Sequence, residues 1–356
     1  MKAILALEDG TTFVGEPLGK LGIARGEVVF TTSMTGYQEV LSDPSYRGQI
    51  VVMTYPLIGN YGVSEDAWEA PEIHVAGFVV REPTVPSHWK AVSDLHSTLR
   101  ARGIVGISGV DTRRLVLHLR TKGLMRGVIG PSLYPPQELV SMARAIPHIG
   151  AQGLVEEVSP LHPQHFPGDG PRIALLDCGV KRGILSALQV RGCEVWCVPP
   201  RMPAQEILGF NPDGIVISNG PGDPARLVDV AREVGHLLEK KPVLGICLGH
   251  QLVALAMGAR TYKMKFGHRG SNHPVEWVGR GKVLITTQNH GFAVEEETLP
   301  KEVEVSFRHL HDGTVEGLRH RRLPVLTTQF HPEGRPGPRD AEGVYDLFLD
   351  MVRGHA

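Results

Sequence analysis

The chain has 356 residues, and at about 100–200 residues per domain this length favours two domains. Hydrophobic residues make up 42% and charged residues 21%, which excludes a globally disordered, collagen-like or coiled-coil chain and leaves enough apolar side chains for a sizeable core. The 37 Lys and Arg residues nearly balance the 38 Asp and Glu residues, and a formal net charge of −1 argues against a general nucleic-acid binder.

Membrane-spanning and secretory segments are not expected. No run approaches the roughly 20 apolar residues of a membrane helix. The apolar run at the N-terminus stops at Glu8, too early for a signal peptide, so a cytoplasmic protein is predicted. Four cysteines are too few for a disulfide framework in a chain this long, and none forms a CxxC pair.

Residues 1–155 predict a β-rich α+β domain. Residues 3–18 and 27–34 have the alternation and glycine turns of strands, and an apolar run ends in a turn at residue 62. Two further segments have Ser or Asp near the start and Gly at the end, which predicts helices at 93–103 and 111–123. Residues 156–171 carry four prolines and two glycines and predict a linker.

Residues 172–356 predict a second domain in which strands and helices alternate. The strands are short and apolar throughout, at 172–179, 193–199, 214–219 and 242–247. Such strands are typical of a mostly parallel sheet with helices on both faces, a doubly wound α/β fold. Further strands are expected at 282–288 and 303–309, a helix at 225–241 and a last helix at 341–355.

The segment Gly245-Ile246-Cys247-Leu248-Gly249 joins a buried strand directly to a helix. It has the pattern of a nucleophile elbow with Cys in place of Ser, which predicts that the Cys247 thiol lies at the carboxyl end of the sheet. Helix N-termini and neighbouring histidines favour thiolates. Taken alone, the motif is equally compatible with a buried structural cysteine.

A second motif, His331-Pro332-Glu333, follows a strand-like segment. Residues two apart in an extended chain share a face, so Glu333 can hold the His331 ring. Together with Cys247, these residues predict a nucleophile–base–orienter triad.

A third motif, NGPGDP at residues 219–224, contains a G-x-G-x-x-A string. Its two prolines remove backbone donors that a phosphate cradle uses, which argues against a dinucleotide site. A loop that offers the N–H of Gly220 or Gly222 to the elbow fits better. No P-loop motif is present, so ATP binding of that kind is not expected.

In this order, NGPGDP, GICLGHQ and FHPE resemble the class I, triad-type glutamine amidotransferases over residues 171–356. Other segments narrow the resemblance to the family of small, glutamine-hydrolysing subunits of carbamoyl-phosphate synthetase. They lie at 264–275 and 288–294 and, in the N-terminal half, at 35–51, 55–62 and 109–115.

The resemblance implies hydrolysis of L-glutamine to glutamate and ammonia through a thioester. Cys247 would be the nucleophile, His331 the acid and base, and Glu333 its orienter, with the N–H groups of Leu248 and Gly222 facing the oxyanion. The glutamine-binding residues carried over from the family are Ser45, Gly220, Gly222, Leu248, Gln251, Asn289, Gly291 and Phe292. No metal ligand is expected; His250 is interpreted as helix surface or structural, and His268 and His273 as structural.

The resemblance also implies a partner. ATP, Mg²⁺ and bicarbonate chemistry would belong to a large subunit that receives ammonia through an internal tunnel and makes carbamoyl phosphate for pyrimidine or arginine biosynthesis. The N-terminal domain would supply much of the interface. No cofactor is expected in this chain, and no nucleic-acid or membrane partner. The alternatives are a glutaminase subunit of another class I amidotransferase, a stand-alone γ-glutamyl hydrolase and a non-catalytic regulatory partner.

Overall fold

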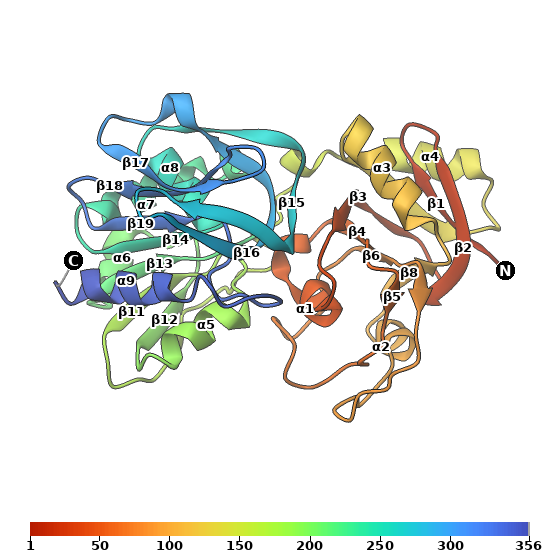
Figure 1. Ribbon diagram of the computed structural model, residues 1–356, viewed down its shortest axis with the longest axis horizontal. Helices are drawn as coiled ribbons and strands as arrows, with labels where there is room; N and C mark the ends of the chain where they lie inside the picture. The colour runs from red at the N-terminus through yellow and green to blue at the C-terminus, as the bar shows by residue number, and fades with distance from the viewer. Residues whose placement is uncertain (355–356) are drawn as a thin grey trace. The chain divides into compact units, whose positions relative to one another are not determined.

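The computed structural model describes residues 1–354, which divide into two compact units after Gln152 (Figure 1). The predicted boundary lies a few residues later, at 155. No helix within residues 1–354 is long and apolar enough to cross a membrane.

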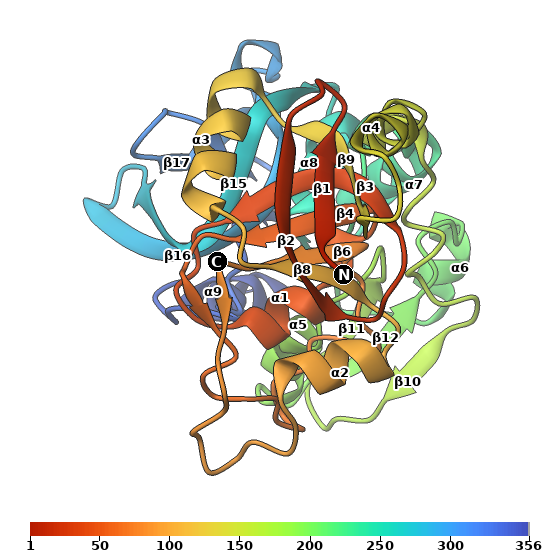
Figure 2. The same ribbon diagram turned by 90° about the vertical axis from the view of Figure 1, so that its right-hand side faces the viewer.

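The first unit is built on a closed barrel with the strand order β1-β2-β8-β6-β4-β3-β9, several strands of which can be followed in Figure 2. β3 pairs in parallel with β4, β4 with β6 and β6 with β8, whereas the other pairs are antiparallel. The strands are β1 (Ala3–Leu7), β2 (Thr12–Gly19), β3 (Ala24–Thr31), β4 (Gln49–Met53), β6 (Gly77–Val79), β8 (Val105–Ser108) and β9 (Met125–Pro131).

The helices of this unit begin and end where local chemistry predicts. Asp94 and Asp111 accept hydrogen bonds from backbone N–H groups in the first turns of α2 and α3, and Gly123 ends α3 with a positive φ. The helices are α1 (Tyr37–Ser42), α2 (Leu95–Ala101), α3 (Thr112–Lys122) and α4 (Pro136–Arg144). The short 3₁₀ helices η1 (Pro44–Tyr46) and η2 (Ile149–Ala151) and the two-stranded sheet of β5 (Leu57–Ile58) and β7 (Glu82–Pro83) complete the unit.

The core of the first unit follows from this pattern. Val29, Val51 and Phe78 are fully buried and belong to one apolar cluster, and α4 covers another with Leu139 over Ile4. The β-rich α+β prediction is confirmed, whereas closure into a barrel was not predicted.

The second unit contains a mixed sheet in the order β10-β12-β11-β13-β14-β19-β18-β17-β15-β16. Its middle strands, from β12 to β19, run parallel, and antiparallel strands extend it on both sides. The parallel strands are β11 (Arg172–Leu176), β12 (Glu194–Val198), β13 (Gly214–Ile217), β14 (Val243–Ile246) and β19 (Val325–Thr328). The antiparallel strands are β10 (Gln164–Phe166), β15 (Arg260–Trp277), β16 (Lys282–Glu295), β17 (Val303–His309) and β18 (Val315–His320).

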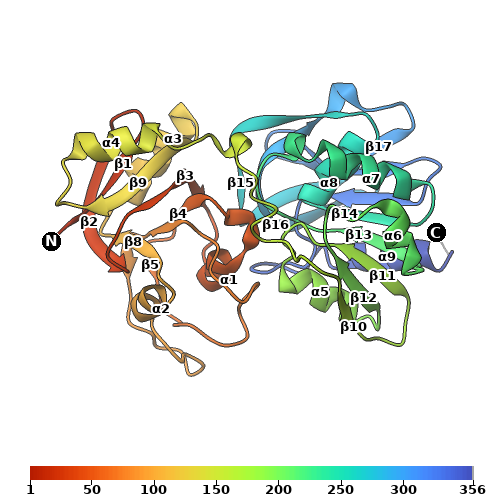
Figure 3. The same cartoon turned by 180° about the vertical axis from the view of Figure 1, so that it is seen from behind.

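Helices cover both faces of this sheet. Along β11, Ile173 and Leu175 belong to the cluster beneath α5 and α9, while Ala174 and Leu176 belong to the cluster beneath α6, α7 and α8 (Figures 1 and 3). This alternation explains why the strand is apolar throughout and confirms the doubly wound fold. The helices are α5 (Arg182–Gln189), α6 (Ala204–Gly209), α7 (Val228–Leu238), α8 (Leu248–Ala256) and α9 (Gly343–Val352), with the 3₁₀ helices η3 (Pro224–Arg226) and η4 (Glu296–Thr298).

Three local expectations need correction. The predicted linker 156–171 includes β10, in which Phe166 pairs with Val195 of the edge strand β12. The predicted helix 225–241 is divided into η3 and α7. The strand expected at 282–288 continues to Glu295, because it forms a long hairpin with β15. The last helix, α9, ends at Val352, and residue 355 of its predicted span lies outside the described residues.

Candidate active site

Cys247 occupies a strained junction between β14 and α8. Its φ of 55° and ψ of −103° are unusual for a residue with a side chain and cost on the order of 1–3 kcal/mol. The flanking glycines are required by close packing. A Cβ on Gly245 would lie 2.7 Å from the Gly249 carbonyl oxygen, and one on Gly249 would lie 2.1 Å from that of Ile217. The thiol is therefore held at the carboxyl end of the parallel strands and the N-terminus of a helix, as the elbow motif predicts.

His331 follows β19, the strand next to β14. The Cys247 backbone N–H donates to the Thr328 carbonyl at 2.7 Å, and the His331 backbone N–H donates to the Thr287 carbonyl of β16 at 2.8 Å. The Glu333 carboxylate holds the ring, with 2.7 Å between His331 Nδ1 and Glu333 Oε1. Both side chains are buried, so the orientation is fixed inside the protein.

The electrostatics favour a charged His331–Glu333 pair. Burial alone would lower the pKa of His331, but the Glu333 carboxylate outweighs it and, with a contribution from the Cys247 thiol, raises this pKa to about 10. Burial would likewise raise the pKa of Glu333, but Lys181 and His331 hold it well below its ordinary value. Within the described residues the buried Nε2 of His331 has no conventional hydrogen-bond partner. That nitrogen is the one left to exchange a proton with the thiol and with a substrate.

Sequence reasoning missed Lys181, which precedes α5. Its Nζ lies 2.7 Å from Glu333 Oε1 and also donates to the Arg335 carbonyl, and the residue is only 1% exposed. The signal in the sequence is faint, because Lys181 and Arg182 begin a helix as ordinary surface residues would. Its place just after β11, at the same carboxyl edge as Cys247, was the available clue.

The loop after β13 reaches the start of α8. A Cβ on Gly220 would lie 2.2 Å from the Cys178 carbonyl oxygen and 2.8 Å from the Leu248 side chain, so only glycine permits this approach. Gly222 adopts a positive φ of 92°. The structure thus brings Gly220 and Leu248 together beside the elbow.

Strand β16 brings the other predicted residues of the second unit to the same place. The Cys247 thiol lies 3.7 Å from the Asn289 carbonyl oxygen. The Gln251 side chain donates from Nε2 to the Phe292 carbonyl at 2.9 Å and to Gln329 Oε1 at 3.0 Å. Gly291 lies between these contacts on the strand, where a Cβ would meet Arg269 Nη2 at 3.1 Å.

Ser45 lies in η1 of the first unit. Its backbone N–H donates to Asp43 Oδ1 at 2.9 Å, and the residue is buried. These contacts of Ser45 lie within the first unit. The predicted role of Ser45 in glutamine binding stays a prediction.

The histidines with expected structural roles are buried or partly buried. His250 is fully buried, so the helix-surface interpretation is wrong; its Nδ1 lies 2.8 Å from Thr327 Oγ1, and burial lowers its pKa to about 3. His268 and His273 lie on β15 among other side chains that have the chemistry of metal ligands. The groups with this chemistry are His268, His273 and His309, and His268, His290 and Glu316.

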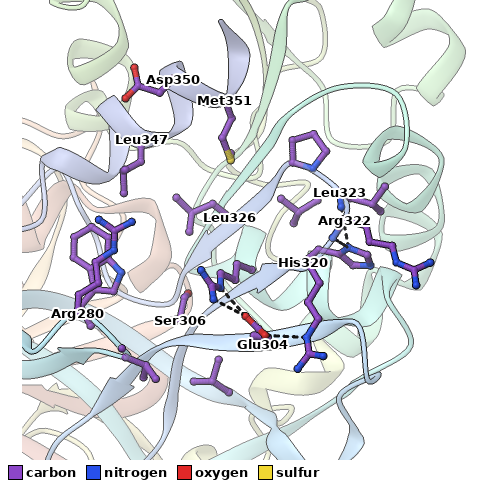
Figure 4. Close-up of a pocket in the computed structure, with 18 residues that line it drawn as sticks. Arg280, Glu304, Ser306, His320, Arg322, Leu323, Leu326, Leu347, Asp350 and Met351 are labelled. Carbon is purple, nitrogen blue, oxygen red and sulfur yellow. Dashed lines mark hydrogen bonds and ion pairs between the residues drawn. The ribbon is translucent and has the colours of Figure 1, made fainter. Parts of the chain in front are cut away.

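A separate cavity of about 940 Å³ lies at the amino end of β19, away from the elbow (Figure 4). Arg319 and Arg321 pair with Glu304 at 2.7 and 2.8 Å, so much of its charge is neutralised locally. This cavity opens at the opposite end of the parallel strands from Cys247 and shares no residue with the elbow. The elbow, and not this cavity, is therefore the candidate active site.

The arrangement at the elbow suits acyl transfer. A thiol at a helix N-terminus interacts with an imidazole that a carboxylate holds in place. A glycine loop and a strand edge beside them supply backbone polar groups. Burial of the three side chains keeps bulk water from competing in the reaction.

Comparison with known families agrees with both units. The model of the glutamine amidotransferase class-I family matches residues 174–351. The model described as the carbamoyl-phosphate synthase small chain, CPSase domain, matches residues 5–129.

Curated relatives match over almost the whole chain. The carbamoyl phosphate synthase small chains of Akkermansia muciniphila and Bacillus caldolyticus are 48% and 51% identical, each over 99% of this chain and 98% and 97% of their own lengths. That of Archaeoglobus fulgidus is 48% identical over 99% of both chains. The chain belongs to the carbamoyl-phosphate synthase small chain family.

Proposed function

We propose that the chain is the glutaminase subunit of a carbamoyl-phosphate synthase. The observation that carries the proposal is the buried array in which Glu333 holds His331 at 2.7 Å behind the strained Cys247 elbow. Membership of the small chain family favours this reading over a subunit of another class I amidotransferase, because the family's CPSase domain covers residues 5–129.

In the proposed mechanism the Cys247 thiolate attacks the side-chain carbonyl carbon of L-glutamine. The C=O bond becomes an oxyanion, stabilised by the backbone N–H groups of Leu248 and Gly222. Losing one such donor typically costs on the order of 10²–10³ in rate. His331 then gives its proton to the departing nitrogen, the C–N bond breaks, and ammonia leaves a thioester on Cys247.

In the second half of the reaction His331 takes a proton from water, which attacks the thioester. The C–S bond breaks, glutamate leaves and the thiolate is restored. Glu333 keeps one tautomer and one orientation of the ring through both steps. In this proposal Gly220, Gln251, Asn289, Gly291, Phe292 and Ser45 bind the glutamine.

Ammonia made in this way needs an acceptor close by, because in neutral water it is mostly protonated and no longer nucleophilic. The proposal therefore includes a heteromer with a large subunit that binds ATP and Mg²⁺ and uses bicarbonate. This chain itself needs no cofactor for the glutaminase step, and a cytoplasmic location stays a prediction.

Covalent trapping tests the proposal. The purified chain would be incubated with a glutamine-derived chloroketone, with and without excess glutamine, alone and with its large subunit, and the adduct located by peptide mass spectrometry. We expect one adduct, on Cys247, that glutamine suppresses. An adduct elsewhere, or none even with the large subunit present, would overturn the assignment. The Cys247→Ala variant separates the alternatives further, since a purely regulatory subunit would support glutamine-dependent synthesis unchanged.

A further inference from the structure

Four neighbouring strands of the second unit converge on a cluster of imidazoles and carboxylates. His268 and His273 come from β15, His309 ends β17, and Glu316 lies on β18. His290 of β16 is paired with His268 across the hairpin. They come from four different strands, so their meeting is a product of the fold, and none of them belongs to the proposed triad.

We propose that His268, His273 and His309 bind a divalent transition metal, Zn²⁺ in the first instance, as a structural site behind strand β16. Neutral imidazole nitrogens are the ligands that this class of ion prefers together with carboxylates. This metal site is separate from the proposed glutaminase site. The proposal does not depend on whether the chain hydrolyses glutamine.

The distances fit one ion. One nitrogen of each of the three rings lies within 4.8 Å of the other two. His273 Nδ1 and His309 Nε2 are 3.0 Å apart and form a hydrogen bond in the metal-free chain, which an ion between them would replace. Two nitrogens bound tetrahedrally at about 2.0–2.1 Å from Zn²⁺ are about 3.3 Å apart, so this pair is close to a ligand edge.

The ring positions agree with this geometry for His273. Its centroid lies 5.3 Å from those of His268 and His309, and imidazoles sharing a tetrahedral ion have centroids about 5 Å apart. His268 and His309 are stacked 4.2 Å apart with their planes 22° from parallel, so on binding an ion one of these rings must move away and turn.

Carboxylates are placed to support the ligands. Glu316 Oε1 lies 3.3 Å from His268 Nδ1 and Asp312 Oδ2 lies 2.8 Å from Nε2, so both ring nitrogens face anions and the ring must be protonated when no metal is bound. A dication can replace that proton on Nε2 while Glu316 keeps Nδ1–H, the carboxylate–histidine–metal arrangement of many zinc sites. Two carboxylates then balance the two positive charges of the ion.

One nitrogen of this cluster lacks a partner. Within the described residues the buried Nε2 of His273 has no hydrogen-bond partner, although Nδ1 of the same ring lies 3.0 Å from His309 Nε2. In the other possible group, Gln288 lies 3.0 Å from His290 Nε2 and donates to Glu316 Oε2 at 3.0 Å, so an ion there would break a side-chain bridge. Asp312 is 44% exposed on the β17–β18 turn, which gives an ion a path into the cluster.

Metal binding is tested on the full chain, stripped with a chelator and titrated with Co²⁺ and Zn²⁺. The Cys247→Ala background removes the active-site thiol as a competing ligand. We expect about one equivalent of tightly bound ion and an X-ray absorption spectrum with imidazole and oxygen neighbours and no sulfur. A spectrum containing sulfur, or fewer than two imidazoles, overturns the site without any further variant.

Two ligand variants and one control complete the test. His273→Asn and His309→Gln should each weaken Zn²⁺ binding by at least about tenfold. His236→Gln, on the exposed side of α7, should leave it unchanged. Thermal unfolding without metal shows that each variant is folded before it is titrated. Absence of a tight site in the parent, or equal affinity in the parent and both ligand variants, contradicts the proposal.

Discussion

Lys181 Nζ and His331 Nδ1 both lie 2.7 Å from the same atom, Oε1 of Glu333. The carboxylate is buried and so is each of its partners. Two cations flank the one anion, which explains how the protein keeps an ionised Glu333 away from water.

The Lys181→Met variant should lose stability and activity together. Losing one charged donor to a buried carboxylate typically costs about 1–3 kcal/mol, because Glu333 keeps its pairing with His331 but loses the hydrogen bond from Lys181. We expect a drop of that size in the free energy of unfolding in urea, with slower glutamate release because Glu333 no longer holds one position. Lys240→Met, at an exposed site after α7, should change stability by less than about 0.5 kcal/mol. Equal stabilities of the two variants would contradict this account.

The raised pKa of His331 predicts a pH-dependent contribution to stability. Burial lowers this pKa, but Glu333 raises it overall to about 10. An unfolded histidine titrates near about 6.5, so the folded chain keeps a proton that the unfolded chain loses above that pH. The resulting stabilisation is complete below about pH 6.5 and is lost as the pH rises towards about 10.

Comparing Cys247→Ala with Cys247→Ala/His331→Asn isolates this effect, because the thiol no longer titrates. The difference between their free energies of unfolding should shrink by up to about 1.4 kcal/mol per pH unit between about pH 7 and pH 9. Urea unfolding at each pH measures it. A difference independent of pH would mean that His331 is neutral in the folded chain.

The parallel part of the second unit could be predicted because its strands are buried on both faces. Ile173 and Ala174 contact opposite layers, so the strand reads as a continuous apolar run. The elbow could also be predicted from local sequence. Backbone crowding at Gly245 and Gly249 leaves room for no other residue type, so the motif requires glycine at both positions.

Features that depend on distant pairing could not be predicted. The barrel closes where β1 meets β9, more than a hundred residues away, and β6 (Gly77–Val79) is too short to show alternation. β10 was not predicted because it lies in a proline-rich stretch. It is a strand only through its pairing with β12. The role of Lys181 could not be predicted for the same reason, because its partner Glu333 is 152 residues away. The histidine cluster likewise forms only when separate strands pair.

Gly249→Ala should disrupt the elbow. A Cβ there would lie 2.1 Å from the Ile217 carbonyl oxygen, and backbone on both sides prevents relief without moving β13 or α8. We expect a loss of about 3 kcal/mol in the free energy of unfolding and loss of chloroketone labelling at Cys247. Gly209→Ala at the end of α6, where a Cβ meets nothing within 4 Å, should be neutral or slightly stabilising. Similar melting temperatures for both variants would be inconsistent with the crowding at the elbow.

Gln251→Met should affect substrate binding more than chemistry. The side chain keeps nearly the same volume but loses the donor that joins the Phe292 carbonyl to Gln329, so the β16 segment from Asn289 to Phe292 is held less firmly. Leaving buried acceptors without a donor typically costs about 1–3 kcal/mol. If much of this cost falls on the glutamine-bound state, KM for glutamine rises by about tenfold with a smaller change in kcat.

Steady-state glutaminase assays that resolve KM from kcat make the measurement, with Gln205→Met on the exposed side of α6 as the matched control. A fall in kcat alone would instead place Gln251 in the chemical step, since a group that acts only in the transition state lowers kcat and kcat/KM equally. An unchanged KM and kcat would show that the β16 segment holds its position without the Gln251 bridge. The β15–β16 hairpin itself would then position Asn289 and Phe292.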